Sequence, residues 1–177
     1  MVLVGCTPPG RRVEQHDFFF GIANSIEDLF PEIKAFWPEG KVHIDAWREV
    51  NKVEDYQIKI TSKGDKMVNP GQLFFINLGG YLENRFEEQH YIILTVKRDK
   101  AEATKEAKST LFYEHNNFEG APSHIDDRYG IDVDDIYQIE DLLSPTQKQQ
   151  YQVEIIPAVD LGEDAFHLGY LKLPMVD

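Results

Sequence analysis

The sequence has one cysteine, few basic residues and no long apolar run. Cys6 is the only cysteine among 177 residues, so an intramolecular disulfide is excluded. Because small secreted domains often depend on several disulfides, a reducing compartment fits best. No stretch approaches the roughly eighteen consecutive apolar residues that a membrane-spanning helix needs. We therefore predict a cytoplasmic protein that has no membrane partner.

Positive charge is also scarce. The chain has 18 Lys and Arg residues against 31 Asp and Glu residues, which gives a formal net charge of −13. Such a chain repels a phosphate backbone at long range, so we predict no nucleic-acid partner. Apolar residues make up 42% of the sequence and charged residues 28%, which is typical of a globular protein. A chain of this length is expected to form one compact unit around a core.

The sequence resembles itself at a fixed offset. Residues 1–35 align without a gap to residues 75–109, and after a seven-residue insertion the alignment resumes at a larger offset. Three tripeptides recur in the same order: Glu14-Gln15-His16 and Glu88-Gln89-His90, His43-Ile44-Asp45 and His124-Ile125-Asp126, Tyr56-Gln57-Ile58 and Tyr137-Gln138-Ile139. Three ordered matches with one insertion indicate a duplicated supersecondary unit.

Both halves also share one pattern of predicted elements. Each opens with two apolar runs that predict strands, at residues 1–4 and 17–23 and at residues 73–78 and 91–96. Ser25 and Asp99 then occupy positions suited to a helix N-cap, with an acidic residue three positions later. Pro31 must kink the first helix or delay its start. Alternation predicts a further strand at residues 42–50 and 124–133, whereas residues 136–143 suit either a strand or a short helix.

These elements predict an α+β fold with a mainly antiparallel sheet. Two tandem β-β-α-β copies would occupy residues 1–63 and 72–143, packed as one pseudo-symmetric unit. Residues 144–177 would close the same compact unit with a C-terminal β-hairpin, formed by strands at 151–159 and 166–173. The interface between the two copies is the natural place for a cleft.

Several of these residues resemble a known bacterial family. Glu14-Gln15-His16 precedes a Phe-rich strand, a helix runs to Trp37, and residues 43–50 read HIDAWREV. Together they are similar to the domain of unknown function numbered 1543, which occurs in one or two copies per chain. The resemblance covers about residues 12–60 and, more loosely, 86–140. It implies two tandem copies, and it implies no activity, cofactor or catalytic residue.

The repeated tripeptides nominate one candidate site. In a strand, residues two apart share a face, so Glu14 lies beside His16 and His43 beside Asp45. Two imidazoles and two carboxylates could hold a divalent metal or act as a general acid and base. They could equally form hydrogen bonds that only satisfy polar groups of the fold. The equivalents in the second copy would be Glu88, His90, His124 and Asp126.

Two further features carry an alternative each. Arg11, in the loop from Gly5 to Arg12, could bind an anion, although a tight proline turn with solvated arginines explains the same loop. Trp37 and Trp47 could line a pocket or belong to the core. Cys6 has no triad partner at motif spacing, so we expect it to be a core residue.

Two functions from different classes fit this sequence. The first is a non-catalytic module that binds a small ligand or a protein partner at the cleft between the copies. The alternative is a metal-dependent enzyme, for example a hydrolase, in which His16, His43 and Asp45 ligate the ion and Glu14 acts as base or fourth ligand. Homo-oligomerisation through paired sheets is a further hypothesis.

Overall fold

The computed structural model describes residues 1–64, 68–81, 86–109 and 131–174. Its strands and helices are, in chain order, β1 (Val2–Cys6), β2 (Gln15–Phe19), the 3₁₀ helix η1 (Glu27–Leu29), α1 (Phe30–Phe36), β3 (His43–Trp47), β4 (Lys52–Val53), β5 (Tyr56–Ser62), β6 (Gln72–Tyr81), β7 (Glu88–Lys97), α2 (Lys100–Ala107), β8 (Ile131–Gln138), α4 (Ile139–Leu142), α5 (Pro145–Gln150), β9 (Tyr151–Pro157) and β10 (His167–Lys172). The helices of these described ranges are too short or too polar to cross a bilayer.

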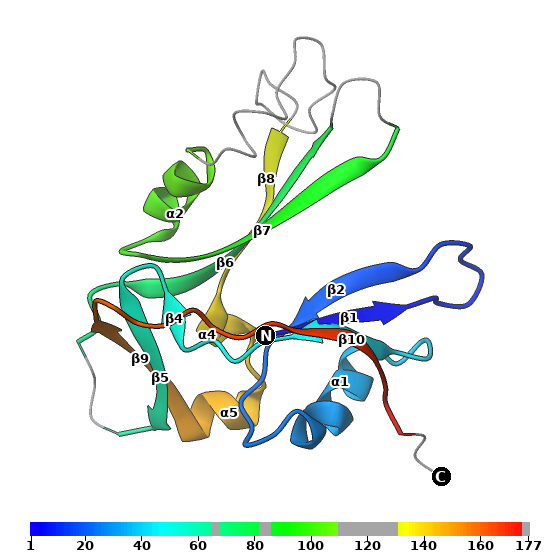
Figure 1. Cartoon of the computed structure of the whole chain (residues 1–177), viewed down its shortest axis with the longest axis horizontal. Helices are drawn as coiled ribbons and strands as arrows, with labels where there is room; N and C mark the ends of the chain where they lie inside the picture. The colour runs from blue at the N-terminus through cyan, green and yellow to red at the C-terminus, as the bar shows by residue number, and fades with distance from the viewer. Residues whose placement is uncertain (65–67, 82–85, 110–130, 175–177) are drawn as a thin grey trace.

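The strands form three antiparallel sheets. Sheet A has the order β10-β3-β1-β2, sheet B has β4-β5-β9, and sheet C has β7-β6-β8. Sheet C extends above the other two in Figure 1, while sheets A and B lie side by side below it, and α1 packs beside sheet A. The predicted α+β class with a mainly antiparallel arrangement is confirmed.

Strands β3-β1-β2 of sheet A and strands β8-β6-β7 of sheet C share an order and a pairing register. In sheet A, Gly5 lies opposite His16, and in sheet C, Gly79 lies opposite His90. Every pair of β1 with β2 has a counterpart in β6 and β7 that is shifted by the offset seen in the sequence. The third strands, β3 and β8, each meet their central strand with a register shift at corresponding positions.

The predicted C-terminal hairpin is wrong. β9 pairs with β5 in sheet B, whereas β10 pairs with β3 in sheet A, so the two last strands do not contact each other as a hairpin. β9 pairs with the edge of β5 and β10 with the edge of β3, both of which are strands formed earlier in the chain. Alternation of apolar and polar residues indicates that a strand exists, but it does not indicate which neighbouring strand it pairs with.

The third pair of repeated tripeptides is not structurally equivalent. Tyr56–Ile58 lies in β5 of sheet B, whereas Tyr137 and Gln138 end β8 of sheet C and Ile139 begins α4. The alternative left open for residues 136–143 therefore resolves into the end of a strand followed by one helical turn. The second pair cannot be compared directly, because residues 124–126 lie outside the described ranges.

The helix signals were largely correct. Asp99 is the N-cap of α2, and its Oδ1 accepts a hydrogen bond of 2.9 Å from the backbone N–H of Glu102. Pro31 delays the first helix, because α1 begins at Phe30 with the proline in its first turn. The Ser25 hydroxyl accepts a longer bond of 3.4 Å from the Asp28 N–H, ahead of η1 rather than at the start of α1.

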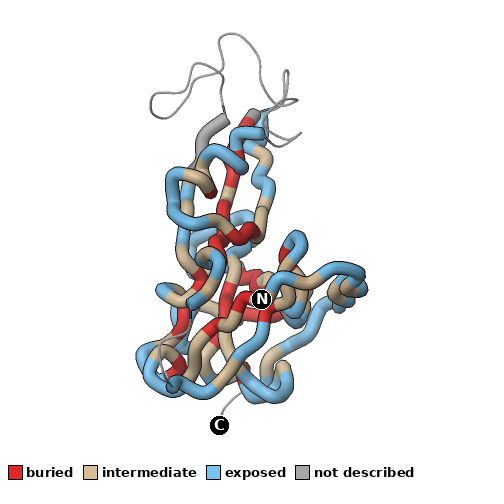
Figure 2. Tube along the Cα trace, turned by 90° about the vertical axis from the view of Figure 1, so that its left-hand side faces the viewer, coloured by how far each residue is buried: buried red, intermediate tan, exposed pale blue. Residues whose placement is uncertain are grey.

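The buried side chains form three separate clusters. One joins sheets B and C through residues such as Phe20, Ile58 and Phe75; another lies between sheet A and α1, around Val4 and Ile33. A third packs Ala103 and Ala107 of α2 against sheet C. Figure 2 shows the buried segments in the interior of the molecule, with exposed chain around them.

Candidate functional site

Three neighbouring strands of sheet A bring the two predicted histidines to one face. Gly5 of β1 lies opposite His16 of β2 on one side and opposite His43 of β3 on the other. Residues directly opposite in antiparallel strands point to the same face of the sheet. The two imidazoles therefore flank a glycine whose missing side chain leaves space between them.

All four residues nominated from the sequence converge there, and we call Glu14, His16, His43 and Asp45 the His–acid cluster. Nε2 of His43 lies 3.1 Å from Oε1 of Glu14 and 3.2 Å from Oδ1 of Asp45. Nε2 of His16 lies 3.4 Å from Oδ2 of Asp45 and 3.8 Å from Oε2 of Glu14. Each imidazole thus faces both carboxylates in an alternating ring.

The cluster has a buried side and an open side. The side chain of His43 is 7% exposed and that of Asp45 is 25% exposed, whereas Glu14 and His16 are 42% and 46% exposed. Oδ2 of Asp45 is buried and makes no hydrogen bond, although it faces His16. A buried carboxylate oxygen without a hydrogen bond is uncommon, because its desolvation is not offset. The cluster is therefore reachable from solvent and incompletely satisfied.

A β-bulge at Asp45 turns Trp47 to the opposite face of sheet A from His43 and Asp45. The pairing of β1 with β3 shifts between Leu3 and Val4, which leaves Asp45 as the unpaired residue. Beyond the bulge, Trp47 packs into the apolar cluster between sheet A and α1, while Asp45 contacts His43. The bulge thus separates a polar face from an apolar face within five residues of one strand.

Gly5 is required beneath the cluster. A Cβ atom at this position would lie 2.5 Å from Oδ2 of Asp45 and 2.6 Å from Nε2 of His43. The C-terminal strand covers the opposite side, because the Tyr170 ring packs 4.3 Å from the His43 ring, centroid to centroid. Sequence reasoning did not include either residue. The pairing of Gly5 with Gly79 in the repeat was the available signal for the glycine, and none marked Tyr170.

The second half carries part of the same arrangement. Nε2 of His90 lies 3.8 Å from Oε2 of Glu88, as His16 does from Glu14. Across Gly79, however, the residue in register is Asp132 of β8, where sheet A has His43. His124 and Asp126, the predicted equivalents of His43 and Asp45, lie outside the described residues.

The other sequence candidates lie apart from the cluster. The backbone N–H of Arg11 donates a 3.1 Å hydrogen bond to the Pro8 carbonyl, which closes a turn, and the Arg11 side chain is exposed. Cys6 is buried, as expected of a core residue. Burial, followed by the charges of Glu14 and Glu39, raises the pKa of its thiol. A raised pKa disfavours the nucleophilic thiolate.

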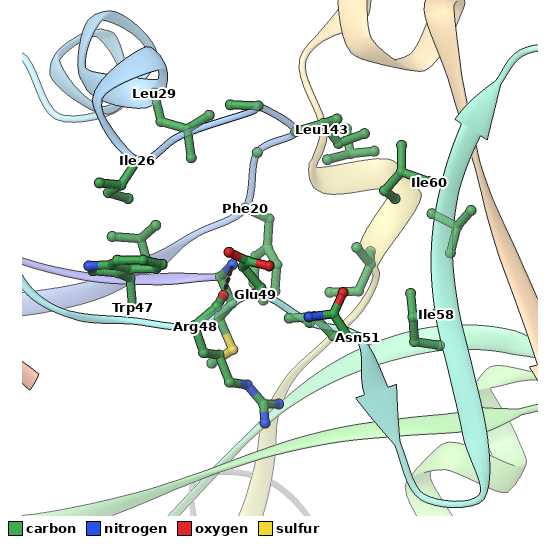
Figure 3. A pocket seen from close by; sticks show the side chains of 18 of the residues that line it. Phe20, Ile26, Leu29, Trp47, Arg48, Glu49, Asn51, Ile58, Ile60 and Leu143 are labelled. Carbon is green, nitrogen blue, oxygen red and sulfur yellow. Dashed lines mark hydrogen bonds between the residues drawn. The ribbon is translucent and has the colours of Figure 1, made fainter. Parts of the chain in front are cut away.

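A cavity of about 820 Å³ lies where the three sheets meet, and we call it the junction cavity. Its walls include Trp47 from sheet A, Ile58 and Ile60 from sheet B, and Leu73 and Leu94 from sheet C. Figure 3 shows Trp47 and Ile26 on one side of the cavity and Ile58 and Ile60 on the other. The sequence predicted a cleft between the copies and offered Trp37 and Trp47 as pocket residues. Trp47 lines the cavity, whereas Trp37 packs against the apolar cluster of sheet A, and the other lining residues were not identified.

Polar side chains also line the junction cavity. Glu27, Glu49 and Asn51 line it and are exposed. Arg48 also lines it, but its guanidinium lies 3.9 Å from Asp164 and 5.4 Å from the centroid of the Phe166 ring. In Figure 3 this guanidinium points away from the apolar side chains. The charged side chains left at the cavity are therefore acidic. The α-amino group of Met1 also lies at the cavity, where it donates a hydrogen bond to the Arg48 carbonyl and burial lowers its pKa to about 6.

Comparison with known proteins finds a family match within the first half of the chain. Residues 11–60, which include the whole His–acid cluster, match the family model described as Domain of Unknown Function (DUF1543). No curated protein matches the chain. The crystal structure of protein Il1583 from Idiomarina loihiensis is similar, with a TM-score of 0.64 and 20% identity, over 98% of this chain and 96% of that one. At that identity the likeness shows a shared fold alone.

Proposed function

We propose that this chain, which carries a DUF1543 domain at residues 11–60, is a non-catalytic module that binds a small molecule in the junction cavity. The observation that carries the proposal is a cavity of about 820 Å³ lined by side chains of all three sheets. Ligand pockets of proteins occupy about 300–1,000 Å³ and are mostly apolar with a few polar groups.

The cavity divides what would otherwise be one core. Phe20, Ile58 and Leu143 on its wall belong to the cluster of sheets B and C, and Val2 and Leu29 belong to the cluster of sheet A and α1. Protein interiors are close-packed and contain few voids larger than a water molecule. An apolar ligand that covered these walls would gain roughly 25 cal/mol for each Å² of apolar surface removed from water.

The lining also favours one class of ligand. Apolar walls suit an aliphatic or aromatic body, and Asn51 offers an amide for one polar group. Glu27 and Glu49 at the cavity disfavour an anionic ligand, while Arg48 is paired with Asp164. The cavity is therefore suited to an apolar molecule whose polar end is neutral or cationic.

A cavity-filling substitution tests this proposal. Ile60 lines the cavity and is 44% exposed, so Ile60→Trp adds bulk at the mouth without overpacking a buried site. The neutral dye N-phenyl-1-naphthylamine should fluoresce on binding to the unmodified chain, and Ile60→Trp should weaken this binding at least about tenfold, because the larger indole occupies the space.

The matched control places the same side chain elsewhere. Val159 is 82% exposed and does not line the cavity, so Val159→Trp should bind the dye as the unmodified chain does. Equal dye binding by Ile60→Trp and the unmodified chain, with both folded by circular dichroism, would reject the junction cavity as the binding site.

A further inference from the structure

We propose that the His–acid cluster binds one divalent metal ion of the zinc class, held by Glu14, His16, His43 and Asp45. This inference does not depend on the junction cavity. It concerns the opposite face of sheet A, because Trp47 lines the cavity while Asp45 and His43 contact each other across Gly5. Imidazole and carboxylate are the ligands that zinc and its neighbours accept.

The distances within the cluster suit a small ion. Zinc binds nitrogen and oxygen at about 2.0–2.2 Å, so donor atoms around it in a tetrahedron lie about 3.4 Å apart. The nitrogen-to-oxygen distances of the cluster are 3.1, 3.2, 3.4 and 3.8 Å, which bracket that value. The backbone therefore brings the four side chains close together, and a common ion would require some of them to turn toward one point.

The charges of the cluster favour a cation. The two carboxylates carry two negative charges. Both face imidazoles, which are charged only when protonated, rather than a permanently charged side chain. The N–H proton on each Nε2 can be donated to only one carboxylate at a time. The buried Oδ2 of Asp45 has no hydrogen bond, and a bound ion would satisfy it.

The open half of the cluster must turn to complete the site. Each carboxylate presents one oxygen to His43 and the other to His16. As they stand, no three donors among the described residues are placed to hold an ion together. His43 and Asp45 are the less exposed pair, while Glu14 and His16 are nearly half exposed and free to rotate toward a common point. Because the two side chains that would move are the exposed ones, an ion could reach the site from solvent before they close around it.

Metal analysis of the full chain tests the inference. After treatment with a chelator and dialysis against Zn²⁺, the chain should retain one equivalent by elemental analysis, and a roughly hundredfold excess of Mg²⁺ should not displace it because magnesium prefers all-oxygen sites. The double variant Glu14→Gln, His16→Ala should lose this equivalent. Both positions are exposed, so the variant should keep its circular dichroism spectrum and its binding of N-phenyl-1-naphthylamine.

The second half of the chain supplies a matched control. Glu88 and His90 have the same spacing of 3.8 Å and similar exposure, 37% and 49%, but the residue in register across Gly79 is Asp132, where sheet A has His43. Glu88→Gln, His90→Ala should therefore retain one equivalent of Zn²⁺. Retention of zinc by the Glu14→Gln, His16→Ala variant, equal loss from the two variants, or no stoichiometric zinc in the unmodified chain would each overturn the proposal.

Discussion

At the scale of single residues, the most constrained position beside the His–acid cluster is Gly5. Its φ angle is ordinary, so its identity is required by space and not by backbone conformation. Atoms of His43 and Asp45 fill the volume that a side chain would take. A glycine in a strand interior often marks such a close approach.

Gly5→Ala should therefore destabilise the chain and separate the cluster. The new methyl group would force His43, which is held by its burial and by the Tyr170 ring, away from Asp45. We expect a loss of roughly 1–3 kcal/mol in the free energy of unfolding, as for other overpacked sites, measured by urea denaturation. Gly162→Ala is the control, because nothing lies within 4 Å of a Cβ there. A loss in the control as large as in Gly5→Ala would refute the steric explanation.

Residue patterns predicted the donors of the cluster better than its surroundings. Spacing of two along a strand placed Glu14 with His16 and His43 with Asp45, and the structure brings all four together. The bulge at Asp45 and the covering ring of Tyr170 depend on contacts between distant segments, which a local pattern does not encode. A hydrolase, the alternative function drawn from the sequence, would first require this cluster to hold its metal.

At the scale of elements, α2 is the helix whose start the sequence specified most sharply. Its N-cap Asp99 accepts a hydrogen bond from the backbone of Glu102, and only two alanines of the helix are buried. A short helix with so little buried surface depends strongly on its cap.

Asp99→Ala should lower the free energy of unfolding by about 1 kcal/mol, because a backbone N–H of the first turn loses its partner. Asp99→Asn should restore most of the loss, since the amide oxygen can accept the same bond. Ser25→Ala provides the comparison: its bond is 3.4 Å long and does not cap α1, so the cost there should be smaller. Thermal denaturation of the three variants measures these changes in stability. A larger loss of stability in Ser25→Ala than in Asp99→Ala would contradict this account.

Element order was less predictable than element type. Strand and helix signals located most elements in the described ranges, but the partners of β9 and β10 were wrong because edges are chosen by the assembled sheets. We propose, with the register of sheets A and C as support, that the two halves descend from one β-β-α-β unit. In that register Asp132 lies opposite Gly79, as His43 lies opposite Gly5.

At the scale of the whole molecule, aromatic rings of sheets A and C pack against each other, and carboxylates of like charge lie next to this contact. The Phe18 ring lies 5.5 Å from the Phe75 ring, centroid to centroid. Next to this contact, burial raises the pKa of Asp17, the hydrogen bond from the Phe18 N–H opposes that rise, and the negative charge of Asp135 adds to it. Ionisation of Asp17 therefore works against the docking of the two sheets.

This effect predicts how stability depends on pH. Because the pKa of Asp17 is raised in the folded state, its cost is absent below the ordinary pKa of 3.8 and grows as pH rises through the folded-state value. Asp17→Asn should therefore gain stability over the unmodified chain as pH increases from about 4 to 7, by urea denaturation at several pH values. A constant difference for Asp17→Asn would exclude this origin.

The placement of β10 has a consequence for the order of assembly. His43 gains its neighbour Tyr170, and β3 gains its outer partner, from a strand more than 120 residues later in the chain. Contacts of such long sequence separation form slowly, because a long loop must close before they stabilise anything. During synthesis on the ribosome, the packing of Tyr170 over His43 is therefore completed only after β10 has emerged.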